Sequence, residues 1–404
     1  MTEKESGQQV KNYDGKQAMQ LILLLGLVSA LGDITYESGR SVSGPYLLLL
    51  GASAGVVGLV SGLGEFAGYA LRLVSGYLAD RTRTYWLATF IGYGLLISIP
   101  ILAYTDRWEI AALLLILERV GKAIRSPARD TILSYATRQT GRGWGFAIHE
   151  ALDQVGAVIG PLLFTAAYLA RGSYRDGFSS LWIPAILTLV ALIIARLRVP
   201  TPEKLETTKT TEDAQPNKTP LPPAFWIYSA FTFLSVAGFA NFQIISFHFA
   251  TQEILPLGYI PILYAGAMGV DAVAALVVGK SYDRFGLKSL IIIPFATLLL
   301  PIFNLSRQIP LILFGVILWG IVMATHETVM RASIADLIPK GRRAFAYGIF
   351  NTLYGGAWFL GSTALGFLYD LNPIFLIGFV AVVEAAAFGI FFVLQRAIKT
   401  ASSA

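Results

Sequence analysis

Charged side chains lie inside long apolar stretches of this 404-residue sequence, where they can bind protons or ions. Asp33 and Glu37 are four residues apart within one such stretch, so they share one face of a helix. A charge in a bilayer core costs about 2.5–3.5 kcal/mol on insertion scales, so these carboxylates must face protein or water. Because the pKa of a buried carboxyl responds strongly to its neighbours, we predict that this pair carries protons.

Four basic residues form a stripe along a second apolar stretch. They are Arg119, Lys122, Arg125 and Arg129. At about 100° per residue they fall within one third of the helix circumference and present one positive face. Two neighbouring basic groups can grip a carboxylate or a phosphate, which makes organic anions alternative ligands. Arg125 is the expected partner of Asp33 near mid-membrane, and a static salt bridge between them is the alternative to proton coupling.

Further ionisable residues in apolar stretches extend the predicted proton path. They are Glu150, Asp153 and Glu327. His149 and Asp153 have the i, i+4 spacing of two ligands on one helix face, so divalent metal transport is a minor alternative. The sequence has only three histidines, and the neighbouring arginines repel cations, so we predict no bound metal.

Polar and aromatic side chains from several stretches are predicted to contact the ligand. This set consists of Tyr36, Arg40, Arg119, Lys122, Arg125, Asn241, Gln243, Trp319, His326 and Tyr354. Asn241 and Gln243 are among the few polar groups in the stretch near 223–250, and they suit ligand contact better than proton transfer.

The composition requires a membrane protein. Hydrophobic residues make up 55% of the chain, charged residues 14%, and the mean hydropathy is +0.62. A soluble domain has about 25% charged residues. The net charge of +6 is not gathered in a basic soluble domain, so we expect no nucleic-acid partner. Cysteine is absent, which excludes disulfides, thiolate metal sites and cysteine nucleophiles.

Apolar runs of about 20 residues predict an all-α integral membrane protein with twelve transmembrane helices. The predicted spans are 17–42, 50–79, 84–104, 108–136, 142–170, 179–198, 223–250, 257–280, 286–306, 309–335, 343–369 and 373–396. The first residues lack the features of a cleaved signal peptide, so we expect the first span to be retained.

The spans fall into two similar halves. Residues 17–198 and 223–396 form two six-helix bundles, joined by a polar linker at 199–222 and flanked by tails at 1–16 and 397–404. The segment from Gly76 to Arg81 recurs in weaker form from Gly279 to Arg284. Such a repeat predicts pseudo-symmetric halves with a site at their interface and a rocking motion between them.

Lysine and arginine in the connections predict the orientation. With both termini cytoplasmic, the inner segments carry twenty Lys and Arg residues, and the outer connections carry only four. Positive residues favour the cytoplasmic side of a membrane. We therefore predict a multi-pass protein of the plasma (cell inner) membrane with cytoplasmic termini and linker, in contact with the lipid bilayer.

Short motifs at the predicted helix ends resemble the major facilitator superfamily over essentially the full chain. Gly76-Tyr-Leu-Ala-Asp80-Arg81 resembles the family's loop 2–3 signature, with a weaker copy at Asp283 and Arg284. The resemblance implies a cytoplasmic gate in which Asp80 closes onto a neighbouring helix terminus or arginine. It also implies that spans 1, 4, 7 and 10 line a central cavity, and that the protein is a monomer.

A second motif in the fifth span resembles the signature associated with exporters of this family. Gly156-Ala-Val-Ile-Gly160-Pro161 contains the small residues and the proline, although the usual glycine pair that follows is replaced. Packing of neighbouring helices is the structural reading of these residues. The resemblance adds an implied role in gating and in export.

These observations predict a secondary transporter working by alternating access, with proton-coupled export of a small organic or amphipathic compound by antiport. Symport or exchange of an organic anion through the basic stripe is the alternative. Enzyme motifs and soluble signalling domains are absent from the sequence, so an enzyme or a receptor is disfavoured, and we expect no cofactor.

Overall fold

The computed structural model describes residues 15–205, 220–338 and 342–403, and these ranges are folded into helices without strands. The α-helices are α1 (Gly15–Leu49), α2 (Ala54–Thr82), α3 (Tyr85–Gly94), α4 (Ser98–Ile101), α5 (Trp108–Thr140), α6 (Arg142–Arg171), α7 (Tyr174–Ser180), α8 (Trp182–Arg198), α9 (Pro223–Ala237), α10 (Phe242–Thr251), α11 (Ile260–Phe285), α12 (Ile292–Asn304), α13 (Ile309–Leu337), α14 (Arg343–Leu371) and α15 (Pro373–Ser403). Short 3₁₀ turns are η1 (Leu95–Ile97), η2 (Leu102–Tyr104), η3 (Pro202–Leu205), η4 (Leu257–Tyr259) and η5 (Gly286–Ile291).

These elements form twelve passes through the molecule. In the described ranges, nine helical stretches are long and apolar enough to cross a membrane, and one of them, 257–304, contains both α11 and α12. The other two passes are α5 and α14. Helix α5 is less apolar because it carries the basic stripe and Glu118. The predicted all-α fold with twelve spans is confirmed.

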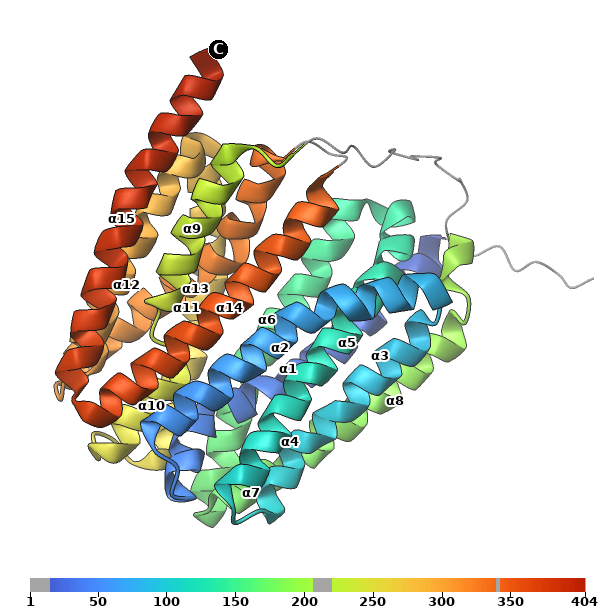
Figure 1. The fold of residues 1–404 in the computed structure, drawn as a ribbon. Coiled ribbons are helices and arrows are strands. Elements are labelled where there is room, and N and C mark those ends of the chain that lie inside the picture. Colours follow the sequence, from blue (N-terminus) through green and yellow to red (C-terminus); the bar gives the residue numbers. More distant parts are fainter. Residues whose placement is uncertain (1–14, 206–219, 339–341, 404) are drawn as a thin grey trace, which may run out of the picture.

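The passes are arranged as two bundles, α1–α8 and α9–α15, that lie side by side (Figure 1). The most extensive contacts between them are made by α2 with α14, α6 with α11, and α1 with α10. We call the side where α8 ends and α9 begins the linker side, and the opposite side the far side. The predicted tail 1–16 and linker 199–222 lie mostly outside the described residues.

The structure differs from the predicted spans in where helices break and end. The predicted span at 223–250 is divided into α9 and α10, because the Asn241 side chain accepts a hydrogen bond from the Ile244 backbone at 2.9 Å and starts a new helix. Helix α15 continues to Ser403, past the predicted end of the span at 396. Helix α1 likewise runs beyond residue 42 to Leu49.

Glycines allow the same close helix contact in both halves. A Cβ atom at Gly160 would lie 2.5 Å from the Ile34 carbonyl oxygen, so α6 can approach α1 only with glycine there. Gly361 of α14 lies against the Ala237 carbonyl of α9 in the same way, and Gly156 lies against Ala30. Helix α6 stays helical through Pro161. The exporter-like motif therefore packs α6 against α1 at Ala30 and Ile34, next to the acidic pair in the chain.

Candidate functional site

A chain of buried ion pairs joins α1, α2 and α5. The Arg40 guanidinium lies 3.8 Å from Glu37 and 3.4 Å from Glu65. Glu65 also pairs with Arg119 at 2.8 Å, so one carboxylate joins two arginines. These four side chains are each no more than 10% exposed. Removing one partner would leave an uncompensated buried charge, which makes the chain of pairs costly to break.

Arg125 is directed toward α3 rather than toward α1. Its guanidinium lies 3.0 Å from Glu118, donates to the Gly92 carbonyl at 3.3 Å and lies over the Tyr93 ring. In the described structure Asp33 and Arg125 therefore do not form the predicted ion pair, although the charge of Arg125 acts on Asp33. Arg125 can turn toward α3 because Gly92 has no side chain, which leaves room for the Arg125 side chain against that helix.

The predicted basic stripe is divided between different partners. The Arg119 guanidinium and the Lys122 ammonium group both lie over the Tyr36 ring, at 4.4 and 4.2 Å from its centroid. Arg129 pairs with Asp130 at 2.9 Å. Within the described ranges, Lys122 has no carboxylate at ion-pair distance, whereas each of the three arginines has one. Among the four basic residues, Lys122 is thus the one whose charge is not paired with a carboxylate in the described ranges.

A small internal cavity lies beside these ion pairs. Its volume is about 30 Å³, with room for about one or two water molecules. Four residues predicted to contact the ligand line it, namely Tyr36, Arg40, Arg119 and Gln243. The first three come from the first half and Gln243 from the second. The structure therefore brings these four together at the interface between the halves.

The remaining members of that set lie outside the cavity lining. The Asn241 amide group donates to Ser61 at 3.2 Å and to Ser362 at 2.8 Å. Ser61 lies on α2 and Ser362 on α14, so Asn241 joins the two halves. Its hydrogen-bonding groups are thus engaged in holding three helices together at the break between α9 and α10.

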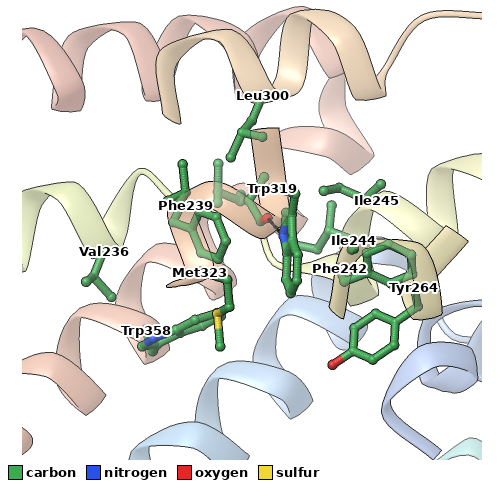
Figure 2. Packing of buried hydrophobic residues seen from close by; sticks show 14 of the residues in the cluster. Val236, Phe239, Phe242, Ile244, Ile245, Tyr264, Leu300, Trp319, Met323 and Trp358 are labelled. Atoms are coloured by element: carbon green, nitrogen blue, oxygen red, sulfur yellow. Dashed lines mark hydrogen bonds between the residues drawn. The ribbon is translucent and has the colours of Figure 1, made fainter. Parts of the chain in front are cut away.

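Trp319 is the centre of an aromatic cluster in the second half. Figure 2 shows it between Phe239 and Phe242, with centroid distances of 5.5 and 5.7 Å. Its indole nitrogen donates to the Ala240 carbonyl at 3.1 Å. Tyr264 packs against Phe242 at 4.7 Å and extends from this cluster toward the first half.

His326 and Tyr354 belong to the same aromatic region. The His326 ring packs 5.0 Å from Phe239 and 6.2 Å from Tyr354 between centroids. His326 is only 1% exposed, and neither of its ring nitrogens has a hydrogen-bond partner in the described part of the chain. Tyr354 also packs 4.9 Å from the Tyr69 ring of α2, so it lies where the two halves meet, whereas the contacts described for His326 are within the second half.

Tyr264 makes the contact that sequence reasoning missed. Its hydroxyl group on α11 donates a short hydrogen bond to the Glu37 carboxylate on α1. Glu37 thereby contacts Arg40 in its own half and Tyr264 in the other half. No sequence signal distinguishes Tyr264 from the other tyrosines, because its partner is distant in the chain.

Acidic side chains from both halves interact electrostatically with Asp271 and Asp33. The charges that act on Asp271 of α11 include those of Glu37, Glu150 and Glu327. Asp33 faces the charges of Asp153 and Lys122, among others. Four of the five predicted proton-carrying residues thus interact electrostatically with Asp271 or with the fifth, Asp33. Asp271, Glu65 and Glu118 were absent from the predicted site, although a charge inside an apolar stretch marks each of them.

The His149 region is a hydrogen-bond network rather than a set of converging ligands. His149 lies 2.9 Å from the Ser29 hydroxyl, to which Arg129 also donates at 2.8 Å. In the described ranges, no three or more His, Asp or Glu side chains converge in a way that could hold a metal ion.

The predicted gate residues lie at the ends of helices on the linker side. Asp80 accepts a hydrogen bond from the Tyr85 hydroxyl at 3.1 Å, and Arg81 donates to Tyr77 at 3.5 Å. Both contacts are within the first half. The corresponding residues of the second half, Asp283 and Arg284, are exposed. Gly76 packs against Pro127 of α5.

Comparisons with known proteins agree on one family. A family model described as the Major Facilitator Superfamily matches residues 18–293 and 257–403. An uncharacterized protein of Mycobacterium tuberculosis is 40% identical over 382 residues, which cover 94% of this chain and 93% of that protein. An uncharacterized MFS-type transporter of Methanocaldococcus jannaschii is 28% identical over 91% of this chain and 93% of its own length.

Solved structures share the fold at low sequence identity. The nucleoside transporter NupG has a TM-score of 0.72 at 15% identity, covering 94% of this chain and 99% of its own. A bacterial homologue of the lysosomal transporter Spinster, in an inward-facing and occupied conformation, has a TM-score of 0.74 at 15% identity. That match covers 94% of this chain and 97% of the homologue.

Proposed function

The chain belongs to the major facilitator superfamily and is a membrane transporter rather than an enzyme, and from this premise we propose that it couples proton movement to the transport of a small organic compound. The proposed direction is export by antiport. The observation that carries the proposal is the position of Glu37, a buried carboxylate that binds Arg40 in one half and Tyr264 in the other.

A proton on Glu37 would change both of its contacts. Hydrogen bonds to an ionised carboxylate are roughly twice as strong as those between neutral groups. Protonation therefore weakens the Tyr264 contact that joins the halves, and it leaves Arg40 with Glu65 as its carboxylate partner. The state of one proton is thus linked to the tightness of the interface. This linkage is what a proton-driven rocking mechanism requires.

The neighbouring carboxyl groups support proton transfer at this place. Glu37, Glu150 and Glu327 act electrostatically on Asp271, and Glu37 and Asp153 act on Asp33. Carboxyl groups that face one another in a low-dielectric core are a general means of binding protons. The small cavity lies against Arg40, so a ligand that widened it and a proton on Glu37 would act on the same arginine.

Two sequence features support the direction of transport. The excess of lysine and arginine in the segments on the linker side favours the cytoplasm for that side. The motif from Gly156 to Pro161 resembles the signature of exporters. Together they favour antiport, in which protons enter the cell as the organic compound leaves it.

An organic anion is the second candidate substrate, and the cavity lining favours it. Arg40 and Arg119 both line the cavity, and the Arg40 Nε group has no hydrogen-bond partner in the described structure. Lys122 adds a charge without a paired carboxylate. The benzoate transport protein of Acinetobacter baylyi is 27% identical over 187 residues, which cover 44% of this chain and 35% of that protein.

The test is transport by the purified protein in liposomes that contain a pH-sensitive dye. Classes of organic compounds are screened for those that trigger proton movement, and the wild type is compared with Glu37→Gln and Asp33→Asn. Glu109→Gln, an exposed carboxylate on the far side, is the matched control. We expect Glu37→Gln to retain exchange of labelled substrate while losing its dependence on the pH gradient.

Two outcomes would contradict parts of the proposal. Unchanged proton coupling in Glu37→Gln would show that this carboxylate does not carry the proton. A second outcome would favour the anion exchanger. In that case only anions are exchanged, no proton movement accompanies the exchange, and Lys122→Gln abolishes it. The sign of the lumenal pH change separates antiport from symport.

A further inference from the structure

A carboxylate of one half caps a helix of the other half on the far side. Asp370, in the last turn of α14, accepts hydrogen bonds from the backbone N–H groups of Ala54 at 2.9 Å and Gly55 at 2.7 Å. These are the first two residues of α2. The first N–H groups of a helix have no partner within it, and they lie at its positive end. Ser53, just before α2, accepts from the Val56 N–H at 3.4 Å, and Asp370 supplies the acceptors for the two preceding N–H groups from the opposite half.

Glycines hold the two helices close enough for this contact. A Cβ atom at Gly55 would lie 2.9 Å from the Asp370 carboxylate and 2.8 Å from the Phe367 ring. A Cβ atom at Gly58 would lie 3.2 Å from the Cα atom of Gly366. The backbones of α2 and α14 thus meet directly beneath the cap, and any separation of the halves on the far side must pull Asp370 away.

The same five-residue pattern ends both helices of this pair. Helix α14 ends with Gly366-Phe-Leu-Tyr-Asp370, and α2 carries Gly76-Tyr-Leu-Ala-Asp80 near its own end. The start of α2 meets the end of α14 on the far side, and the end of α2, with Asp80, lies on the linker side (Figure 1). In this conformation Asp370 caps the opposite half, whereas Asp80 accepts a hydrogen bond from Tyr85 of its own half.

We propose that Asp370 is the gating residue of the far side, and that its cap on α2 stabilises the conformation in which this side is closed. Opening of the far side releases both hydrogen bonds and exposes the start of α2. The Gly-aromatic-Leu-x-Asp pattern on α2 places Asp80 to act correspondingly on the linker side in the other conformation. This inference requires alternating access but is independent of any proton on Glu37.

The absence of cysteine from the sequence makes a direct test simple. Val57 lines the internal cavity and is fully buried beneath the far-side contact, so Val57→Cys reports opening of that side. Its reaction with a membrane-impermeant maleimide is measured in intact cells, without added substrate. The Val57→Cys protein is compared with proteins that carry Asp370→Ala or Asp370→Asn in addition. The control adds Asp106→Asn instead, which removes an exposed carboxylate on the far side.

We expect Asp370→Ala to raise the labelling rate about two- to thirtyfold, the range for loss of a helix-capping carboxylate. Asp106→Asn should leave the rate unchanged. If Asp370→Ala does not reach the membrane, Asp370→Asn decides, because it keeps the side-chain shape and removes the charge. An unchanged rate in a correctly inserted Asp370 variant would overturn the proposal. Because the readout is opening of the far side rather than proton movement, and all variants are labelled under the same conditions, this proposal can fail without the proposed coupling failing, and the reverse.

Discussion

Replacing Tyr264 by phenylalanine isolates the hydrogen bond between the halves at Glu37. The ring contacts with Phe242 and Trp319, at 4.7 and 5.9 Å between centroids, are retained, and only the hydroxyl group is lost. A hydrogen bond to a charged group contributes about 1.5–3 kcal/mol. The hydrogen bond joins α1 to α11 and exists only while the two halves are in contact at Glu37. Its loss therefore destabilises the far-side-closed conformation and favours the far-side-open one.

The expected change in population follows from that energy. A difference of about 1.5–3 kcal/mol changes an equilibrium constant by about 10- to 150-fold. A far-side-open conformation populated at about 1% would therefore rise to about 10–60% in Tyr264→Phe. In the open conformation water can donate to Glu37 in place of the tyrosine, so Tyr264→Phe removes a hydrogen bond from the closed conformation but not from the open one.

Distances between two spin labels measure this population. Leu49 at the end of α1 and Tyr259 just before α11 are exposed on the far side of opposite halves, and both can be replaced by cysteine and labelled. Tyr228→Phe is the matched control, because its hydroxyl donates at 2.7 Å to the Met330 carbonyl within one half. An equal distance distribution in Tyr264→Phe and in Tyr228→Phe would show that the Tyr264–Glu37 hydrogen bond does not stabilise the closed conformation.

Two further predictions concern stability, measured by thermal unfolding in detergent. Gly160→Ala places a Cβ atom 2.5 Å from the Ile34 carbonyl oxygen and should lower the free energy of unfolding by about 1–3 kcal/mol. The control Gly266→Ala should be nearly neutral, because no atom lies within 4 Å of the new Cβ. Equal effects of the two substitutions would contradict the packing role of Gly160. Arg119→Met leaves the buried Glu65 carboxylate undercompensated and should cost about 3–5 kcal/mol. Adding Glu65→Gln to Arg119→Met should restore part of that stability, and a double variant no more stable than the single one would argue against the ion pair.

Features that depend on short stretches of sequence could be predicted without a structure. Runs of about 20 apolar residues are required wherever a helix crosses lipid, so the twelve passes and the division into halves are visible in the sequence. The cost of charge in a membrane likewise marks Asp33, Glu37 and Arg119 as residues that face protein or water. The glycines of the exporter-like motif were interpreted as packing residues, and Gly160 packs against α1.

Features that depend on which helix faces meet could not be predicted in this way. Arg125 was expected to bind Asp33, and it binds Glu118, because the packing of α5 against α3 directs its side chain away from α1. Helix periodicity gives the face on which a residue lies, but it does not give the neighbour that this face meets.

The helices and the charges within them follow from short stretches of sequence, because hydrophobicity and the cost of buried charge are properties of each stretch. The partners of those charges depend on how the helices pack in three dimensions. Tyr264 contacts Glu37 and Asp370 caps α2 across hundreds of residues, since both contacts arise from the docking of two separately patterned bundles. That docking is also what alternating access must change, so the contacts that the sequence left open are those through which the transporter is proposed to work.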